Sequence, residues 1–395
     1  MRIAIFSDNF YPELSGISDS IISLAKELAV RGHVINFYVP RYGAANYKKV
    51  GLPVEEIALG ENIKITRFFS LPYGTGTGQG RVVIPTGLRW LCVMRFKPDI
   101  IHTQLFFTIG LEALIASRIL GVPIVGTNHT AVKEFARYAP IHTHAVENLL
   151  IRYVNWFYEK CGRVTMPSKS VADEMKQFGF SGECRVISNP IDTKTFSPSS
   201  RKAELKNELR FSKFTVIHAG RLAGERNVDV IIKAIAVAKQ TIPEIELAIA
   251  GGGSYEGELR SLARDRGIEN SIKFLGVLSK PDLAKAYNAS EIFAITSTAD
   301  TQSLVMMQAM ACGIPIIGVK ARALPEYINP KNGILIEPGD EKALAEKIVF
   351  LYKNENIRKK LGDGARKYSI QFSAPEIASQ WEKMYEEIVT RYNLK

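Results

Sequence analysis

The sequence predicts an α/β protein with two doubly wound domains, each a mostly parallel sheet covered by helices, facing each other across a cleft. Short apolar strand-like runs alternate with helical patterns along almost the whole chain, and this alternation restarts near residue 196. A length of 395 residues also exceeds that of a typical single domain. We expect a first domain, a second domain and a C-terminal helix that returns to the first domain, over residues 1–196, 197–372 and 373–395.

The composition is that of a globular chain, with 46% apolar and 23% charged residues, and it is sufficient for two cores. The apolar run in MRIAIFSDNFYP is too short for a signal peptide. No uninterrupted apolar run reaches about 18 residues, so we expect no membrane-spanning helix. The four cysteines are scattered without metal-ligand spacing, which suits a reducing cytoplasm.

The first half opens with a strand, a helix and a second strand, predicted over residues 1–6, 17–32 and 34–39. Gly16 precedes the helix, where its backbone N–H can approach a phosphate, although a simple turn glycine fits equally well. Further strands are predicted at residues 63–69, 99–102, 123–127, 163–167 and 185–188, with helices at 111–120, 146–161 and 171–178. The glycine-rich stretch at residues 74–80 is expected to be a loop that closes over a ligand or only connects two elements.

His129 follows the strand predicted at residues 123–127. Ligands gather at the carboxyl ends of strands in open α/β sheets, so this histidine is a candidate site residue. A lone histidine is more often structural, and both interpretations remain open.

The second half repeats the pattern. Its strands are predicted at residues 215–218, 246–250, 272–275, 292–296 and 314–319, and its helices at 228–238, 255–266, 280–288 and within 300–311. Three glycines, residues 251–253, follow the second of these strands. The chain ends in an amphipathic helix, residues 375–392, whose apolar stripe is more typical of a core than of a partner site.

The stretch STADTQSLVMMQAMACGIPIIG, residues 297–318, combines a polar loop with a buried helix. The N–H groups near Ser303, at the start of that helix, attract phosphate. Arg221 and Arg226 follow the first strand of this half and, with those N–H groups, can hold a diphosphate and stabilise its charge as it leaves. One more crossover helix and two solvated arginines would explain the same residues. The absence of a DxD pair favours cationic side chains over a metal, and no Walker, Ser-His-Asp or zinc pattern is present.

A basic and aromatic segment lies between Glu61 and Asp99 and contains no acidic residue. The whole chain has a formal net charge of +11. Its candidate contact residues are Lys64, Arg67, Arg81, Arg89, Trp90, Arg95 and Lys97. Basic and aromatic side chains together indicate an anionic membrane surface or a nucleic acid. An ordinary solvated face around a core tryptophan is an equal alternative.

Eight segments together resemble the retaining GT-B glycosyltransferases of family four, over almost the whole chain. They are FYPELSG, GTNHT, MPSKSVADEM, VISNPIDTKTF, HAGRLAGERN, AIAGGGSYEGEL, IKFLG and DTQSLVMMQAMACGIPIIG. Any one of them is weak, but the set is specific. TQSLVMMQAMA, ARALPEYI and GTNHT are most similar to the diacylglycerol glucosyltransferase (monoglucosyldiacylglycerol synthase) branch.

The resemblance implies roles for individual residues. Arg221 and Arg226 match the paired basic residues on the donor diphosphate, with Arg226 where lysine is common. Gly16 matches the glycine near the distal phosphate, and His129 the histidine near the transferred sugar and the acceptor. The remaining residues implied in donor binding are Gly252, Asp300, Gln302, Ser303, Leu304 and Gln308.

Asp300 and Gln308 occupy the two ends of the family's Glu-seven-residues-Glu pattern, for sugar hydroxyls and for ribose respectively, and both depart from it. Asp300 is one methylene shorter than glutamate, so the sugar sits differently or binds less tightly. Gln308 can still pair with a diol but lacks the charge-assisted hydrogen bond.

The implied activity is transfer of a hexose, in the first instance glucose from UDP-glucose, to a lipid hydroxyl such as diacylglycerol, with retention and without a metal or other cofactor. The implied place is cytoplasmic, peripheral at the inner face of the cell membrane, on anionic lipid and not on nucleic acid. The alternatives are a GDP-mannose-dependent mannosyltransferase, an epimerase or phosphorylase of the same architecture, and a nucleotide-sugar-binding protein with weak turnover. The two arginines and the 300–308 pattern argue against the epimerase.

Overall fold

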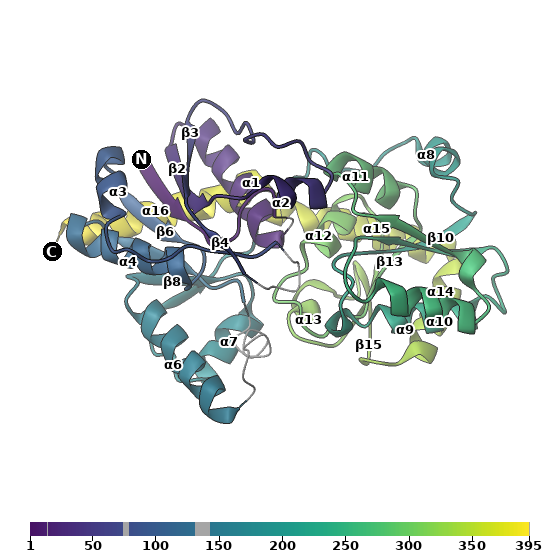
Figure 1. The fold of residues 1–395 in the computed structure, drawn as a ribbon. Coiled ribbons are helices and arrows are strands. Elements are labelled where there is room, and N and C mark those ends of the chain that lie inside the picture. Colours follow the sequence, from purple (N-terminus) through teal and green to yellow (C-terminus); the bar gives the residue numbers. More distant parts are fainter. Residues whose placement is uncertain (14, 74–78, 131–142, 395) are drawn as a thin grey trace. The chain divides into compact units, whose positions relative to one another are not determined.

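The computed structural model describes residues 1–13, 15–73, 79–130 and 143–394, so most of the predicted loop at 74–80 lies outside the described residues. The chain forms two compact units (Figure 1). One contains residues 1–190 together with 374–395, and the other contains residues 191–373. The boundary lies slightly before the predicted residue 196.

The first unit is built on a parallel sheet of seven strands in the order β3-β2-β1-β6-β7-β8-β9. Its strands are β1 (Arg2–Phe6), β2 (Val34–Pro40), β3 (Ile63–Phe68), β6 (Ile100–Thr103), β7 (Ile124–Thr127), β8 (Arg163–Met166) and β9 (Cys184–Val186). The short strands β4 (Leu71–Pro72) and β5 (Arg81–Val82) form a separate antiparallel pair. Nearly continuous apolar strands such as β1 and β2 are typical of a parallel sheet that is buried on both faces.

Helices cover both faces of this sheet. They are α1 (Gly16–Val30), α2 (Ala44–Lys49), α3 (Trp90–Phe96), α4 (Thr108–Leu120), α6 (His144–Glu159), α7 (Lys169–Gln177) and α16 (Ala374–Asn393). Successive side chains of a strand point to opposite faces. In β1, Ile3 and Ile5 therefore join the core with α1 and α16, whereas Ala4 and Phe6 join the core with α4 and α6.

The last helix, α16, belongs to the first unit and packs against α1 (Figure 1). Its buried stripe consists of Ile377, Ala378, Trp381, Met384, Tyr385 and Ile388. Arg31, the C-cap residue of α1, donates a hydrogen bond to the carboxylate of Glu382 at 2.6 Å, and His33 Nε2 lies 2.8 Å from the other oxygen of that carboxylate. The amphipathic pattern of the C-terminal sequence thus covers the sheet of the unit in which the chain began.

The second unit is built on six parallel strands in the order β12-β11-β10-β13-β14-β15. Its strands are β10 (Phe214–Ala219), β11 (Ile245–Ala250), β12 (Ile272–Gly276), β13 (Ile292–Ile295), β14 (Ile316–Val319) and β15 (Gly333–Ile336). The direction of winding reverses between β10 and β13, so the crevice beyond their carboxyl ends is the expected place for a ligand.

The helices of the second unit are α8 (Lys202–Leu209), α9 (Val228–Ala238), α10 (Glu256–Asp265), α11 (Lys280–Asn288), α12 (Leu304–Ala311), α13 (Leu324–Tyr327), α14 (Glu341–Lys353) and α15 (Glu355–Ser369). Three short 3₁₀ turns are η1 (Gly224–Arg226), η2 (Glu269–Ser271) and η3 (Ile370–Phe372). The sequence patterns gave no element between residues 337 and 372, where α14 and α15 lie.

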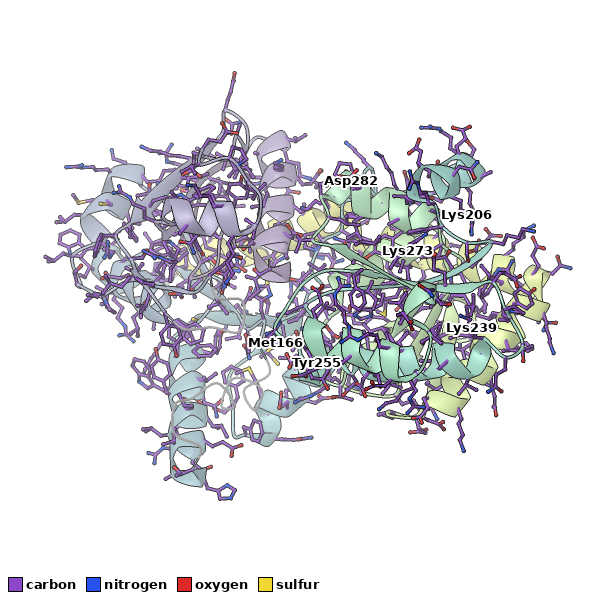
Figure 2. All side chains as sticks on the ribbon, turned by 45° about the vertical axis from the view of Figure 1, so that its right-hand side comes forward. Met166, Lys206, Lys239, Tyr255, Lys273 and Asp282 are labelled. Atoms are coloured by element: carbon purple, nitrogen blue, oxygen red, sulfur yellow. The ribbon has the colours of Figure 1, made fainter. Side chains whose placement is uncertain are left out.

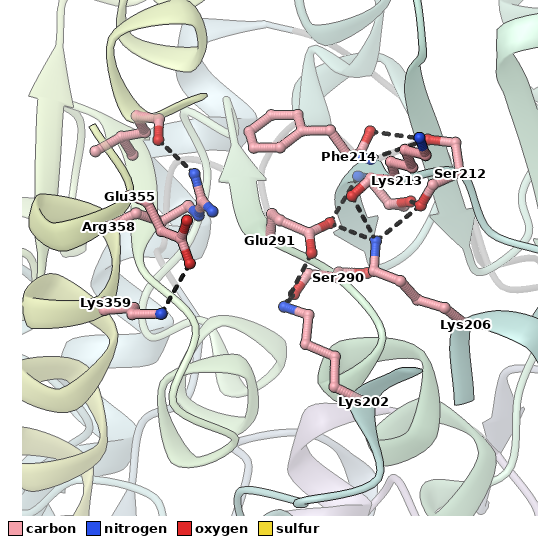
Figure 3. A network of polar contacts seen from close by, with 12 residues as sticks. Lys202, Lys206, Ser212, Lys213, Phe214, Ser290, Glu291, Glu355, Arg358 and Lys359 are labelled. Atoms are coloured by element: carbon pink, nitrogen blue, oxygen red, sulfur yellow. Dashed lines mark hydrogen bonds and ion pairs between the residues drawn. The ribbon is translucent and has the colours of Figure 1, made fainter. Parts of the chain in front are cut away.

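The amino ends of β10 and β13 are held by a buried carboxylate, Glu291 (Figure 3). It accepts hydrogen bonds from Lys206 Nζ and from the backbone N–H of Thr215, each at 2.8 Å, and pairs with Lys202 Nζ at 3.0 Å. Burial lowers the pKa of Lys202 more than the carboxylate raises it. This network connects α8 to the amino-terminal end of the sheet, opposite the crevice at the carboxyl ends of β10 and β13.

Two further lysines secure the same amino-terminal end of the sheet (Figure 2). Lys239 donates to the hydroxyl of Ser271 at 2.6 Å, and Lys273 pairs with Glu246 at 2.8 Å. These two contacts join the segments around the amino ends of β11 and β12.

No helix in the described part of the chain is both long enough and apolar enough to cross a bilayer.

Candidate functional site

The carboxyl end of the second sheet is shaped by close backbone contacts between the loops after β10 and β11. A Cβ added to Gly251 would collide with the carbonyl oxygen of Gly220, and one added to Gly253 would collide with that of Leu222. Gly220 and Gly251 also have φ values of 143° and 133°, which disfavour other residues. The predicted donor-binding glycine, Gly252, lies between the two points of contact.

The two predicted arginines lie at this end, and each has a carboxylate partner. Arg221 Nη2 is 2.6 Å from Glu225 Oε1. Arg226 Nη1 is 2.7 Å from Asp300 Oδ1 and 3.3 Å from the hydroxyl of Ser297. The side chains of Arg221 and Arg226 are both partly exposed.

Asp300 follows β13 and is buried beside Arg226. Burial alone would raise the pKa of Asp300, but the neighbouring Arg226 charge and the Ser297 hydroxyl outweigh it and hold that pKa below its ordinary value. The pair therefore stays ionised, and the charge of Arg226 is locally balanced.

Asn227 fixes the loop that carries Arg226. It takes a left-handed conformation, with φ 50°, between η1 and α9. Its side-chain amide donates to the carbonyl of Thr296 and lies 3.3 Å from the hydroxyl of Thr298. The hydroxyl of Thr296 in turn donates to the Asn227 carbonyl at 2.8 Å. The loops after β10 and β13 are thereby joined, which sets the place of Arg226 relative to Asp300.

Helix α12 begins at this edge of the sheet. Ser303 is its N-cap and accepts a hydrogen bond from the backbone N–H of Met306 at 3.4 Å. The N–H groups at the start of the helix are available for an anion. Gln302, Leu304 and Gln308, the predicted donor-binding residues around this N-cap, are all buried.

Three buried acceptor atoms at this end have no hydrogen-bond partner among the described residues: Asp300 Oδ2, Gln308 Oε1 and His218 Nε2. His218 Nδ1 lies 3.0 Å from the carbonyl of Ala294 and must donate to it, which leaves Nε2 with the lone pair. Burial lowers the pKa of His218 to about 4, so the ring is neutral at pH 7. His218 was not among the predicted site residues; its place just before Gly220-Arg221 was the signal.

The carboxyl end of the first sheet carries the other two predicted residues, Gly16 and His129. Gly16 is the exposed first residue of α1, next to the N-cap Ser15. His129 follows β7, is buried, and its Nε2 lies 2.8 Å from Gln104 Oε1. Burial lowers the pKa of His129 to about 4.

Asp8, which the sequence did not single out, lies after β1 at the same end. Its Oδ1 accepts hydrogen bonds from the hydroxyl of Thr108 and from the N–H of Ile109, each at 3.0 Å. Its Oδ2 is buried without a partner among the described residues. Burial raises the pKa of Asp8 from 3.8 to about 6 against these hydrogen bonds.

The basic and aromatic segment divides into two groups. Arg67 pairs with Glu56 and with backbone carbonyls, Arg81 with Ser70, and Arg89 lies 4.1 Å from the centroid of the Phe68 ring. Trp90 is partly buried against the core. The cations left exposed are Lys64, Arg95 and Lys97.

Two family models match the chain. Residues 200–368 match the model of glycosyl transferases group 1, and residues 14–195 match that of glycosyltransferase family 4. Together the two matches include the second sheet, every strand of the first sheet except β1, and every residue implied in donor binding. The chain is a group 1 glycosyltransferase of the GT-B fold.

Relatives of this glycosyltransferase differ in what they transfer. It is 27% identical to the alpha-monoglucosyldiacylglycerol synthase of Streptococcus pneumoniae over 80% of this chain and 70% of that protein. It is also 27% identical to a GDP-mannose-dependent alpha-mannosyltransferase of Corynebacterium glutamicum over 87% of this chain and 78% of that protein. Identity at this level identifies a transferase of sugars and leaves donor and acceptor open.

Among solved structures, Anabaena Alr3699/HepE in complex with UDP and glucose superimposes with a TM-score of 0.79 at 21% identity. The match covers 98% of this chain and 100% of the Anabaena chain. The likeness confirms the predicted fold of two Rossmann-like units.

Proposed function

We propose that this glycosyltransferase is a retaining hexosyltransferase that moves glucose from UDP-glucose to a lipid hydroxyl such as that of diacylglycerol. The observation that carries the proposal is the combination, at one end of the second sheet, of two arginines with three buried acceptors. These acceptors, on His218, Asp300 and Gln308, receive no hydrogen bond from any residue that the structure describes.

The chemistry of these groups selects a class of ligand. A buried acceptor without a donor costs about 1–3 kcal/mol, so a ligand that supplies hydrogens there is favoured. A phosphate has no hydrogens to offer at neutral pH, whereas sugar and ribose hydroxyls do. The arginines and the start of α12 suit the anion. A diphosphate flanked by two polyols, which is a nucleotide sugar, satisfies both sets of groups.

In the proposed mechanism, the donor diphosphate displaces the carboxylates as partners of Arg221 and Arg226. The guanidinium groups then stabilise the negative charge that develops on the leaving nucleotide, with no metal. The acceptor hydroxyl attacks from the face that the nucleotide leaves, and a donor phosphate oxygen takes its proton. Asp300 binds sugar hydroxyls and Gln308 binds the ribose diol.

The proposal of a lipid acceptor is supported by exposed apolar side chains on the first unit. Phe69, Tyr73, Leu88, Leu91 and Met94 are each 44% or more exposed. Exposed cations accompany them, namely Lys64, Arg95 and Lys97. A concavity of about 430 Å³ beside α3 is lined by Arg2, Lys64 and Arg95. We propose that this face docks on anionic lipid, as a cytoplasmic protein at the inner face of the membrane.

Vesicle flotation tests the docking face. Lys64→Glu combined with Arg95→Glu should abolish binding to vesicles that contain phosphatidylglycerol. The matched control is charge reversal of Lys331 and Lys342, two exposed lysines of the second unit. Equal binding to neutral and anionic vesicles, or unchanged binding by the first variant, refutes this part of the proposal.

Incubation of the purified protein with labelled UDP-glucose and diacylglycerol vesicles tests the function, with GDP-mannose in a parallel reaction. Glucosyldiacylglycerol with an α-linkage supports the proposal, since the donor is an α-glucoside. Mannolipid supports the alternative raised by the Corynebacterium relative, a GDP-mannose-dependent mannosyltransferase. Bound donor without transfer indicates a nucleotide-sugar-binding protein, which Asp300 and Gln308, the departures from the glutamate pattern, keep as a candidate.

A further inference from the structure

A chain of buried hydrogen bonds leads away from His129 into the first unit. His129 Nε2 lies 2.8 Å from Gln104 Oε1, and Gln104 Nε2 lies 3.0 Å from His102 Nε2. His102 Nδ1 lies 2.7 Å from the hydroxyl of Tyr385, and its Nε2 lies 2.7 Å from that of Thr127. These side chains are all between 0% and 8% exposed, so water does not compete for the bonds.

The amide of Gln104 imposes a direction on this chain. Its NH₂ group can only donate and its oxygen can only accept. His102 Nε2 therefore carries a lone pair, and its proton lies on Nδ1, from which it is donated to Tyr385. At the other end, the Gln104 oxygen requires the proton of His129 to lie on Nε2. One amide thus makes the tautomers of the two imidazoles complementary.

Helix α16 contributes Tyr385, the last residue of this series of hydrogen bonds. Tyr385 is fully buried, and the ring of Trp381, one turn earlier, lies 4.5 Å from that of His102 between centroids. Tyr385 and Trp381 therefore fix the orientation of His102 from a helix that is distant in sequence and belongs to the same unit.

We propose that Gln104, His102 and Tyr385 are positioning residues that hold His129 as the neutral tautomer, with its proton on Nε2 and its lone pair on Nδ1. The substrate role of His129 rests on the proposed function; the state of its ring does not. In the proposed function His129 contacts the reacting groups, and Gln104, His102 and Tyr385 act through it.

Loss of the Tyr385 hydroxyl should reverse the donor and acceptor directions along this series of hydrogen bonds. In Tyr385→Phe, a proton on His102 Nδ1 would have no acceptor. Moving it to Nε2 lets the hydroxyl of Thr127 accept it, and the amide of Gln104 then turns over. That turn presents the Gln104 NH₂ group to His129, whose proton moves to Nδ1. A change on α16 is therefore expected to alter the tautomer of a ring after β7.

Side-chain ¹⁵N NMR of the full-length protein tests this directly and needs no ligand. Signals are assigned by His102→Asn and His129→Asn. In the wild type we expect the protonated nitrogen to be Nδ1 in His102 and Nε2 in His129, and both assignments to reverse in Tyr385→Phe. Tyr38→Phe is the matched control, because Tyr38 is also fully buried in the first unit but bonds to the carbonyl of Cys92. A wild-type His129 protonated on Nδ1, or no reversal in Tyr385→Phe, overturns the proposal.

Kinetics provide the second arm. With UDP-glucose and diacylglycerol vesicles, Tyr385→Phe and Gln104→Leu should each lower kcat about tenfold or more, while KM for UDP-glucose changes less than about threefold. A loss confined to KM, or equal losses in Tyr38→Phe, overturns the positioning role. If the wild type transfers no sugar, the proposed function fails, and the NMR result alone decides the tautomer assignment.

Discussion

Replacing Asp8 with asparagine isolates the cost of one buried carboxylate in the first unit. Asparagine keeps an oxygen for the Thr108 hydroxyl and the Ile109 N–H, which lie 3.0 Å from Asp8 Oδ1. It also places a neutral group where Oδ2 is buried without a partner among the described residues. The variant therefore removes a charge with little change in shape.

The magnitude follows from linkage. Burial raises the pKa of Asp8 from 3.8 to about 6, so the native state binds more protons than the unfolded state across that range. Stability is consequently lost as the pH rises from about 4 to 6, and the loss is complete above it. At 1.36 kcal/mol per tenfold change, the cost is about 1 kcal/mol at pH 4.5 and about 3 kcal/mol at pH 7.5.

Urea unfolding at these two pH values measures the difference. Asp8→Asn should be more stable than the wild type by about 3 kcal/mol at pH 7.5, and this advantage should shrink to about 1 kcal/mol at pH 4.5. Asp173→Asn, at an exposed position of α7, is the control and should change neither value. A variant that is less stable than the wild type at pH 7.5, or an advantage independent of pH, would refute the reasoning.

Three further predictions concern the second unit. Arg226→Ala should lower turnover about tenfold or more, a loss of about 1.4 kcal/mol in transition-state stabilisation, and near-wild-type kcat would exclude its role on the diphosphate. His218→Phe removes an acceptor while keeping an aromatic ring, so isothermal titration should show UDP-glucose binding about fivefold weaker or more; unchanged affinity would contradict donor contact. Gly251→Ala, which would collide with the Gly220 carbonyl, should lower the melting temperature sharply, whereas Gly224→Ala, which meets nothing within 4 Å, should not; equal effects would count against the close approach of the loops.

The alternation of strands and helices was readable from the sequence because each element carries its own periodicity. The location of the residues after β10 and β13 was also predictable, because the carboxyl ends of parallel strands lie at the same edge of the sheet. Arg221, Arg226 and Asp300 were therefore expected at the same end of the sheet, and the structure pairs Arg226 with Asp300 and Arg221 with Glu225.

What the sequence could not supply is pairing over long separations. The importance of Tyr385 depends on its contact with His102 of β6, which lies 283 residues earlier in the sequence. Asp8 is distinctive only because burial leaves one of its oxygens without a donor in the described structure. Similarly, the sequence did not show that Arg67 forms an ion pair with Glu56 or that the guanidinium group of Arg89 lies over the Phe68 ring.

Because α16 belongs to the first unit, the first unit is encoded by two separate segments, whereas the second unit is encoded by one. Residues 191–373 are one uninterrupted stretch that contains all six strands of its sheet, so this fragment can be excised whole. A fragment that stops at residue 190 lacks Trp381, Met384 and Tyr385, and the sheet face they cover would meet solvent. Expression of the first unit by itself therefore requires grafting residues 374–395 onto its end. Truncation of those residues in the full chain would expose the core around β1 and α1.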